Sequence, residues 1–153
     1  MHIAKRVAAG FAAMSLLASS PVTANPRLRE AEMIRKLDIM LMVTGLRCRT
    51  TADNFQPDYG RFTTNHIATL NAASNTLKAD YPRRFGPVGA NRALDKLSVQ
   101  MANEYGQGHP WLNCKQLKQV TRSLAEMRGA APLVAAADEL LDRGPRQLAW
   151  LPR

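Results

Sequence analysis

Cys48 and Cys114 are the only cysteines of the chain, and their thiols offer its clearest chemistry. Two thiols in an oxidising compartment form a disulfide, which is the outcome we expect here. The alternative is a reactive thiolate. Cys114 follows Asn113 at the expected start of a helix and precedes Lys115, and a helix dipole with a neighbouring cation favours the thiolate. A nucleophile of this kind also needs a base, for which the sequence offers His66 or His109.

His66, Glu104 and His109 are the residues from which a metal site would have to be built. Their spacing matches no ligand signature, because the chain contains no His-Glu-x-x-His, no Cys-x-x-Cys and no short His-x-His. His66 lies on an apolar helical face, which predicts a core histidine with one hydrogen-bonded ring nitrogen. His109 stands between Gly108 and Pro110 and is expected in an exposed loop. We therefore expect neither a metal nor a cofactor.

The segment EYGQGHPWLNC, residues 104–114, concentrates Glu104, Tyr105, His109 and Trp111 beside Cys114. These residues would line a small cleft, or Trp111 would close the end of the bundle while the glycines permit the turn. The Gly-x-Gly of this segment lacks the preceding strand and the further glycine of a dinucleotide fingerprint. The chain has no Gly-x-Ser-x-Gly and no P-loop. No catalytic residues are assigned.

Four basic residues flank the two cysteines, and a disulfide would bring them together: Arg47, Arg49, Lys115 and Lys118. The net charge is +9 and falls to +7 if Lys5 and Arg6 are removed with a signal peptide. A surplus of this size favours polyanions but specifies no fold. The sequence therefore predicts an anion-binding patch, which Asp53 would partly offset. The alternative is a scattered, solvated set of cations.

Residues 1–24 have the pattern of an export signal. Lys5 and Arg6 form the positive region, residues 7–19 form a short apolar region, and Val22-Thr23-Ala24 fits a cleavage site before Asn25. The alternatives are an N-terminal membrane anchor and a buried first helix. No apolar run approaches the ~20 residues of a spanning helix. Residues 25–153 are long enough for one domain.

The remaining chain predicts an all-α bundle of about five helices. Its composition, 46% apolar and 22% charged, is typical of a globular domain. Apolar residues recur at helical spacing, and no segment alternates as a half-buried strand does. The expected helices cover residues 26–46, 57–81, 87–105, 113–127 and 132–143. Pro82, Gly86 and Pro87 are expected to end the second of them, and Asn113 with Gln116 forms a capping box for the fourth.

Two strings, LDIMLMVTGLRCRTTADNFQPDYGRF and MANEYGQGHPWLNCKQL, resemble small exported helical proteins of Gram-negative bacteria that have no established activity. The resemblance covers most of the chain after residue 24 and implies export, but it carries no catalytic motif. Some short sequences of this kind bear an adenosylhomocysteine hydrolase label. This sequence does not support that label, because it lacks the dinucleotide fingerprint and the length for two domains.

The function predicted from these features is that of a non-catalytic periplasmic or secreted binding protein. Its partner would be an envelope protein or an anionic envelope polymer, with no specific nucleic acid and with no spanning segment after processing. One alternative is an immunity-type inhibitor, by analogy with other small helical domains. The other is a small hydrolase that uses His109 and Glu104. The oligomeric state stays open.

Overall fold

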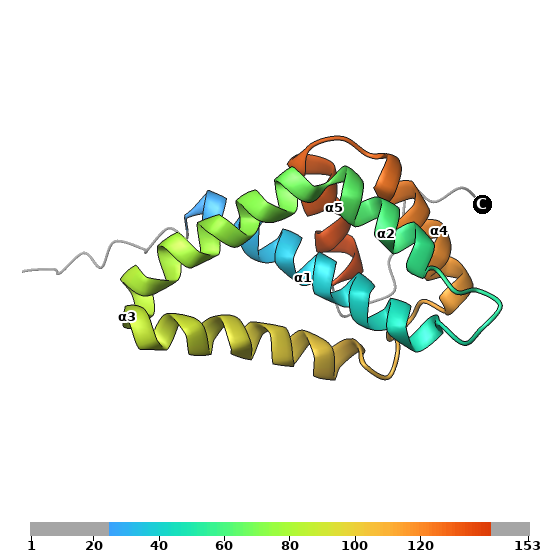
Figure 1. Cartoon of the computed structure of the whole chain (residues 1–153), viewed down its shortest axis with the longest axis horizontal. Helices are drawn as coiled ribbons and strands as arrows, with labels where there is room; N and C mark the ends of the chain where they lie inside the picture. Colours follow the sequence, from blue (N-terminus) through green and yellow to red (C-terminus); the bar gives the residue numbers. More distant parts are fainter. Residues whose placement is uncertain (1–24, 142–153) are drawn as a thin grey trace, which may run out of the picture.

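The computed structural model describes residues 25–141, which fold into five α-helices with no strand among them (Figure 1). The predicted all-α bundle is thus confirmed. In chain order the helices are α1 Pro26–Cys48, α2 Gln56–Asn65, α3 Ile67–Tyr105, α4 Cys114–Glu126 and α5 Ala130–Leu140. The expected signal, residues 1–24, lies outside the described residues, as do the predicted end of the fifth helix at Arg143 and the rest of the chain to residue 153.

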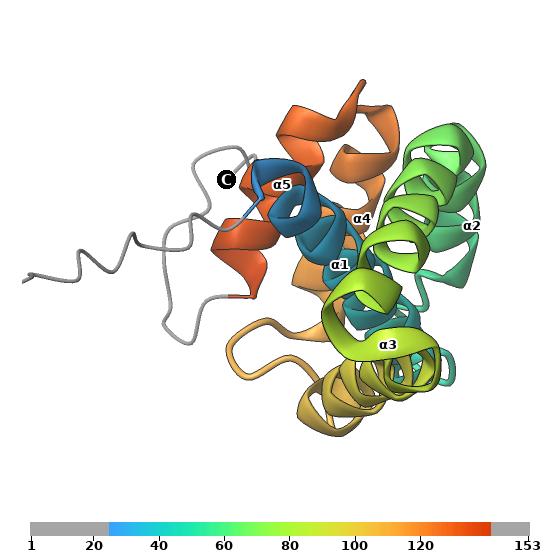
Figure 2. The ribbon, with the colours of Figure 1, turned by 90° about the vertical axis from the view of Figure 1, so that its left-hand side faces the viewer.

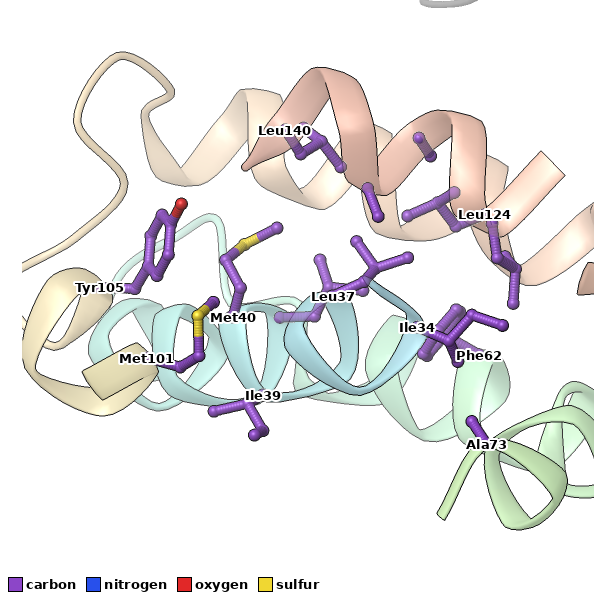
Figure 3. Packing of buried hydrophobic residues seen from close by; sticks show 14 of the residues in the cluster. Ile34, Leu37, Ile39, Met40, Phe62, Ala73, Met101, Tyr105, Leu124 and Leu140 are labelled. Atoms are coloured by element: carbon purple, nitrogen blue, oxygen red, sulfur yellow. The ribbon is translucent and has the colours of Figure 1, made fainter. Parts of the chain in front are cut away.

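Helix α1 runs through the middle of the bundle and contacts each of the other four helices (Figure 2). It begins where Asn25 accepts a hydrogen bond from the backbone N–H of Arg27. Its consecutive residues Ile39, Met40 and Leu41 are all buried. In Figure 3, Met40 points toward the helix that carries Leu140, while Ile39 points to the opposite side. A helix with apolar residues on every side needs neighbouring helices on every side, and α1 has them.

Two tyrosines tie the carboxylates of α1 to the neighbouring helices. The hydroxyl of Tyr59 in α2 donates to Asp38 over 2.8 Å, and the hydroxyl of Tyr81 in α3 donates to Glu32 over 2.9 Å. Burial, together with the bond to Glu32, raises the pKa of Tyr81 to about 12. Burial and the neighbouring Asp38 also raise the pKa of Tyr59. Both tyrosines therefore stay protonated donors at neutral pH.

The continuous helix predicted over residues 57–81 is wrong, because His66 interrupts it. The apolar face is as predicted, but the backbone of His66 (φ −108°, ψ 13°) separates α2 from α3. The side chains at the break explain the bend. Asn65 donates to the backbone oxygen of Ala125, and the His66 ring donates to that of Leu124. Tertiary hydrogen bonds to the end of α4 thus override the helical repeat.

Helix α3 is a pair of arms that meet at an elbow (Figure 1). Pro82 lies inside the first arm and does not end it, contrary to expectation. The break falls at Gly86, which was also expected to end the helix and whose φ of 72° and ψ of 168° are not helical. Pro87 then starts the second arm, because its fixed φ suits a first helical residue. The arm ends at Tyr105 as predicted.

Helices α4 and α5 complete the bundle on the side of α1 away from the elbow (Figure 2). The predicted capping box is present: Asn113 accepts from the backbone of Gln116 over 3.0 Å and donates its own N–H to that side chain over 2.9 Å. Helix α5 starts two residues before the predicted Pro132 and ends at Leu140, three residues before the predicted Arg143. Its Leu133, Ala136, Ala137 and Leu140 are buried.

Candidate functional site

A disulfide joins Cys48, the last residue of α1, to Cys114, the first residue of α4. The two Cα atoms are 5.7 Å apart. Cys48 is 2% exposed, so the bond lies against the core. This confirms the pairing predicted from the sequence and leaves no thiol for the alternative of a reactive Cys114.

The disulfide brings the ends of α1 and α4 together with the cations that flank them. Consecutive Cα atoms are 3.8 Å apart, so the Cα atoms of Arg49 and Lys115 lie within about 13 Å of each other. Arg47, Arg49 and Lys115 are exposed, and Lys118, one turn further along α4, is half-buried. We call these four residues the disulfide cationic surface.

None of these four cations is neutralised by an ion pair within residues 25–141. Asp53, which was expected to offset part of the charge, is half-buried and forms no salt bridge with them. The positive charge therefore faces the solvent. Such charges attract an anion without the cost of breaking an existing pair.

A hollow of about 430 Å³ lies beside this surface, between the end of α1 and the end of α3. It is lined by Arg47 and Arg49, by the apolar Val43 and Leu46, and by Thr50 and Gly106. Leu46 is 47% exposed, so the hollow offers an apolar wall beside two guanidinium groups. From the sequence, Gly106 follows the predicted end of a helix and has no other role. Its place in the hollow depends on how α1 and α3 lie against each other, which no local sequence pattern predicts.

The aromatic residues of the segment 104–114 fill space rather than line a cleft. The rings of Tyr105 and His109 have centroids 5.4 Å apart, and those of His109 and Trp111 are 4.6 Å apart. Tyr105 is 2% exposed and Trp111 is half-buried. These contacts support the interpretation that Trp111 closes the bundle end.

The prediction that His109 is an exposed loop residue is wrong, because the side chain is 8% exposed. Its Nε2 is 2.9 Å from the backbone oxygen of Leu140, and its Nδ1 is 3.5 Å from the backbone N of Trp111. Burial lowers the pKa of His109, against a smaller opposite effect of the Leu140 bond. The ring is thus held neutral, with the proton on the nitrogen that faces Leu140.

The hydrolase alternative gains no support from this geometry. Glu104 is exposed at the end of α3, and it forms no hydrogen bond or ion pair with the buried His109. A general base must reach the proton it removes, and both nitrogens of His109 already have backbone partners. His66 is in a similar position, 3% exposed with Nε2 2.8 Å from the Leu124 oxygen, as predicted for a core histidine.

Buried Asp58 of α2 is a charged residue that the sequence did not single out. Its side chain is 5% exposed and accepts from Arg61 of the same helix and, over 3.3 Å, from Arg122 of α4. The pair fastens α2 to α4. Arg122 lies 64 residues from Asp58 in the chain, so the tertiary fold brings the two together and no spacing in the sequence indicates the contact.

Two other features of the described chain bear on its chemistry. Within residues 25–141, no three His, Cys, Asp or Glu side chains are grouped in a way that would hold a metal ion. A second hollow, of about 490 Å³, lies between α1 and the first arm of α3 and is lined chiefly by alanine and threonine, with Arg27 and Glu30 as its charged residues. The disulfide cationic surface is therefore the better candidate for a binding site.

Comparison with models of protein families finds no match to this chain, and comparisons with curated proteins and with solved structures find none.

Proposed function

We propose that this protein is exported and binds an anionic polymer of the cell envelope through the disulfide cationic surface. The observation that carries the proposal is the set of cations at the Cys48–Cys114 bond, none of which has an ion-pair partner in the described part of the chain. A polymer laid across this surface would release counterions from its own charges, which favours binding at low salt.

Export is supported by the sequence of residues 1–24 and by the disulfide, since such bonds persist in oxidising compartments. The test is the intact mass of the protein recovered from the periplasm. We expect a chain that begins at Asn25 and has no free thiol. Recovery of the unprocessed chain from the cytoplasm would contradict export.

The binding test compares two quadruple variants. One replaces Arg47, Arg49, Lys115 and Lys118 with Gln. The control replaces four remote cations that form no salt bridge within residues 25–141, namely Arg27, Lys36, Lys96 and Arg128. Both variants lose the same net charge, so a difference between them reports a site and not the overall charge.

The probe is dextran sulfate, titrated at about 50 mM and about 200 mM salt. If each contact contributes a few tenths of a kcal/mol, the first variant should lose about tenfold in affinity at low salt. It should also show a shallower dependence of affinity on salt. Equal losses in the two variants would refute a localised site.

A further inference from the structure

The elbow of α3 is a protruding tip with apolar side chains in solvent. It lies at one end of the long axis of the molecule, beyond the other helices (Figure 1). On either side of Gly86 and Pro87, Phe85 is 50% exposed and Val88 is 68% exposed. Val88 has the largest exposure of any large apolar residue in the described chain. The positive φ of Gly86 turns the chain here and holds these two side chains at the apex.

Cations surround this apolar apex. Arg83, Arg84 and Arg92 are exposed and form no salt bridge within residues 25–141. The guanidinium of Arg84 lies over the Phe85 ring, 5.6 Å from its centroid, so charge and apolar surface share one place. Two carboxylates lie near this part of the fold: Asp80 is half-buried, and the half-buried Glu32 of α1 accepts from the Tyr81 hydroxyl, so the three arginines outnumber them.

We propose that this elbow, defined by Arg83, Arg84, Phe85, Val88 and Arg92, docks on an anionic lipid bilayer. Phe85 and Val88 enter the headgroup region, and the three arginines contact lipid phosphates. An anionic bilayer surface favours this combination. Apolar side chains are stabilised when they leave water, and nearby cations are stabilised by the negative surface potential. A convex tip of this kind also fits an extended surface such as a bilayer.

The elbow is separate from the disulfide cationic surface. Cys48 ends α1 at one end of the long axis, and the elbow of α3 projects at the other (Figure 1). Figure 2, viewed toward the elbow, shows it in front of the remaining helices. Lipid docking therefore does not depend on polymer binding, and substitutions at one end should leave the other intact.

The first test measures cosedimentation of the exported protein, with its disulfide intact, on two kinds of vesicle. One contains phosphatidylglycerol mixed with phosphatidylcholine, and the other contains phosphatidylcholine alone. We expect binding to the anionic vesicles and about tenfold weaker binding by the double variant F85S/V88S. The triple variant R83Q/R84Q/R92Q should lose at least as much, since each surface charge contributes roughly fivefold.

Two control variants remove similar apolar exposure, or one more positive charge, away from the elbow. Ile67 and Val99, on the same helix, are 55% and 56% exposed, and the double variant I67S/V99S should bind vesicles as the wild type does. The variant that removes the disulfide cationic surface should lose about tenfold in dextran sulfate affinity but keep most vesicle binding. Unchanged vesicle binding by F85S/V88S, or equal loss in the I67S/V99S control, would overturn the proposal.

A second measurement reads the position of residue 85 directly. The F85W variant should show a blue shift in tryptophan emission on anionic vesicles and quenching by brominated lipid, each taken as the difference from the wild-type signal. If F85W shows neither effect while sedimentation velocity shows that F85S/V88S converts a dimer to a monomer, the elbow is a contact between two copies and the lipid proposal fails.

Discussion

The ring of His109 donates a hydrogen bond to the backbone oxygen of Leu140 over 2.9 Å and closes the carboxyl end of α5. The last carbonyls of a helix have no partner within it, and a buried helix end needs partners from elsewhere. The loop between α3 and α4 supplies one here. His66 does the same for Leu124 near the end of α4.

Acid should weaken the fold through His109. Burial lowers the pKa of this ring below its ordinary 6.5, so the unfolded chain binds a proton more readily than the folded one. The stabilisation is present above pH 6.5 and is lost as the pH falls through 6.5 toward the folded pKa. Urea unfolding between about pH 8 and pH 5 should show this decline. The variant His109→Gln should flatten it, and an unchanged pH dependence would show that other groups cause the decline.

Removing the disulfide should lower the free energy of unfolding by about 4 kcal/mol, because the bond joins residues 66 positions apart. The variant to use is C48A/C114A, which leaves no free thiol. Urea unfolding with and without a reducing agent provides the control. Reduction should destabilise the wild type by a similar amount and leave the double variant unchanged.

The Asp58–Arg122 pair should contribute measurably to the contact between α2 and α4. Asp58→Asn is expected to cost about 1.5 to 3 kcal/mol, since a buried carboxylate loses charge-assisted bonds. A double-mutant cycle with Arg122→Gln isolates the bond between the helices, and Arg61→Gln provides the comparison within α2. Strictly additive effects of the Asp58 and Arg122 substitutions would mean that the pair is not coupled.

The elbow should depend on glycine at position 86. The φ of 72° and ψ of 168° fall in a region that side chains rarely enter, so Gly86→Ala should destabilise the protein by about 1 to 3 kcal/mol. The matched control is Gly60→Ala. Position 60 is exposed and helical with open space around its Cα, so alanine there should stabilise by about 0.5 to 1 kcal/mol. Similar thermal midpoints for the two variants would contradict the strain at Gly86.

The sequence predicts those parts of the fold that local chemistry decides. The Asn113–Gln116 capping box and the end of a helix at Tyr105 each depend on residues close together in the chain. The cysteine pairing also follows, because each of the two cysteines has one possible intramolecular partner. These features need no knowledge of how the helices meet.

The errors arise where distant segments decide the outcome. His66 breaks a well-formed apolar repeat because its ring reaches Leu124, 58 residues away. His109, placed between Gly108 and Pro110, looks like a surface residue until Leu140 covers it. Pro82 stays inside its helix, whereas the chain turns at Gly86 and Pro87, as the sequence also predicts. The same holds for the disulfide cationic surface. Its four cations can be predicted from the sequence, but the residues that line the hollow beside them cannot.

The position of the Cys48–Cys114 bond also determines how the molecule would respond to a protease. All of α2 and α3, including the elbow with its exposed Arg83 and Arg84, lies within the covalent ring that this bond closes, whereas α5 lies outside it. A single cut at the elbow would therefore release no fragment. The two pieces would stay covalently joined and would migrate as one species on a non-reducing gel. A protein cut at this protruding point would therefore keep both parts of its bundle together until the disulfide is reduced.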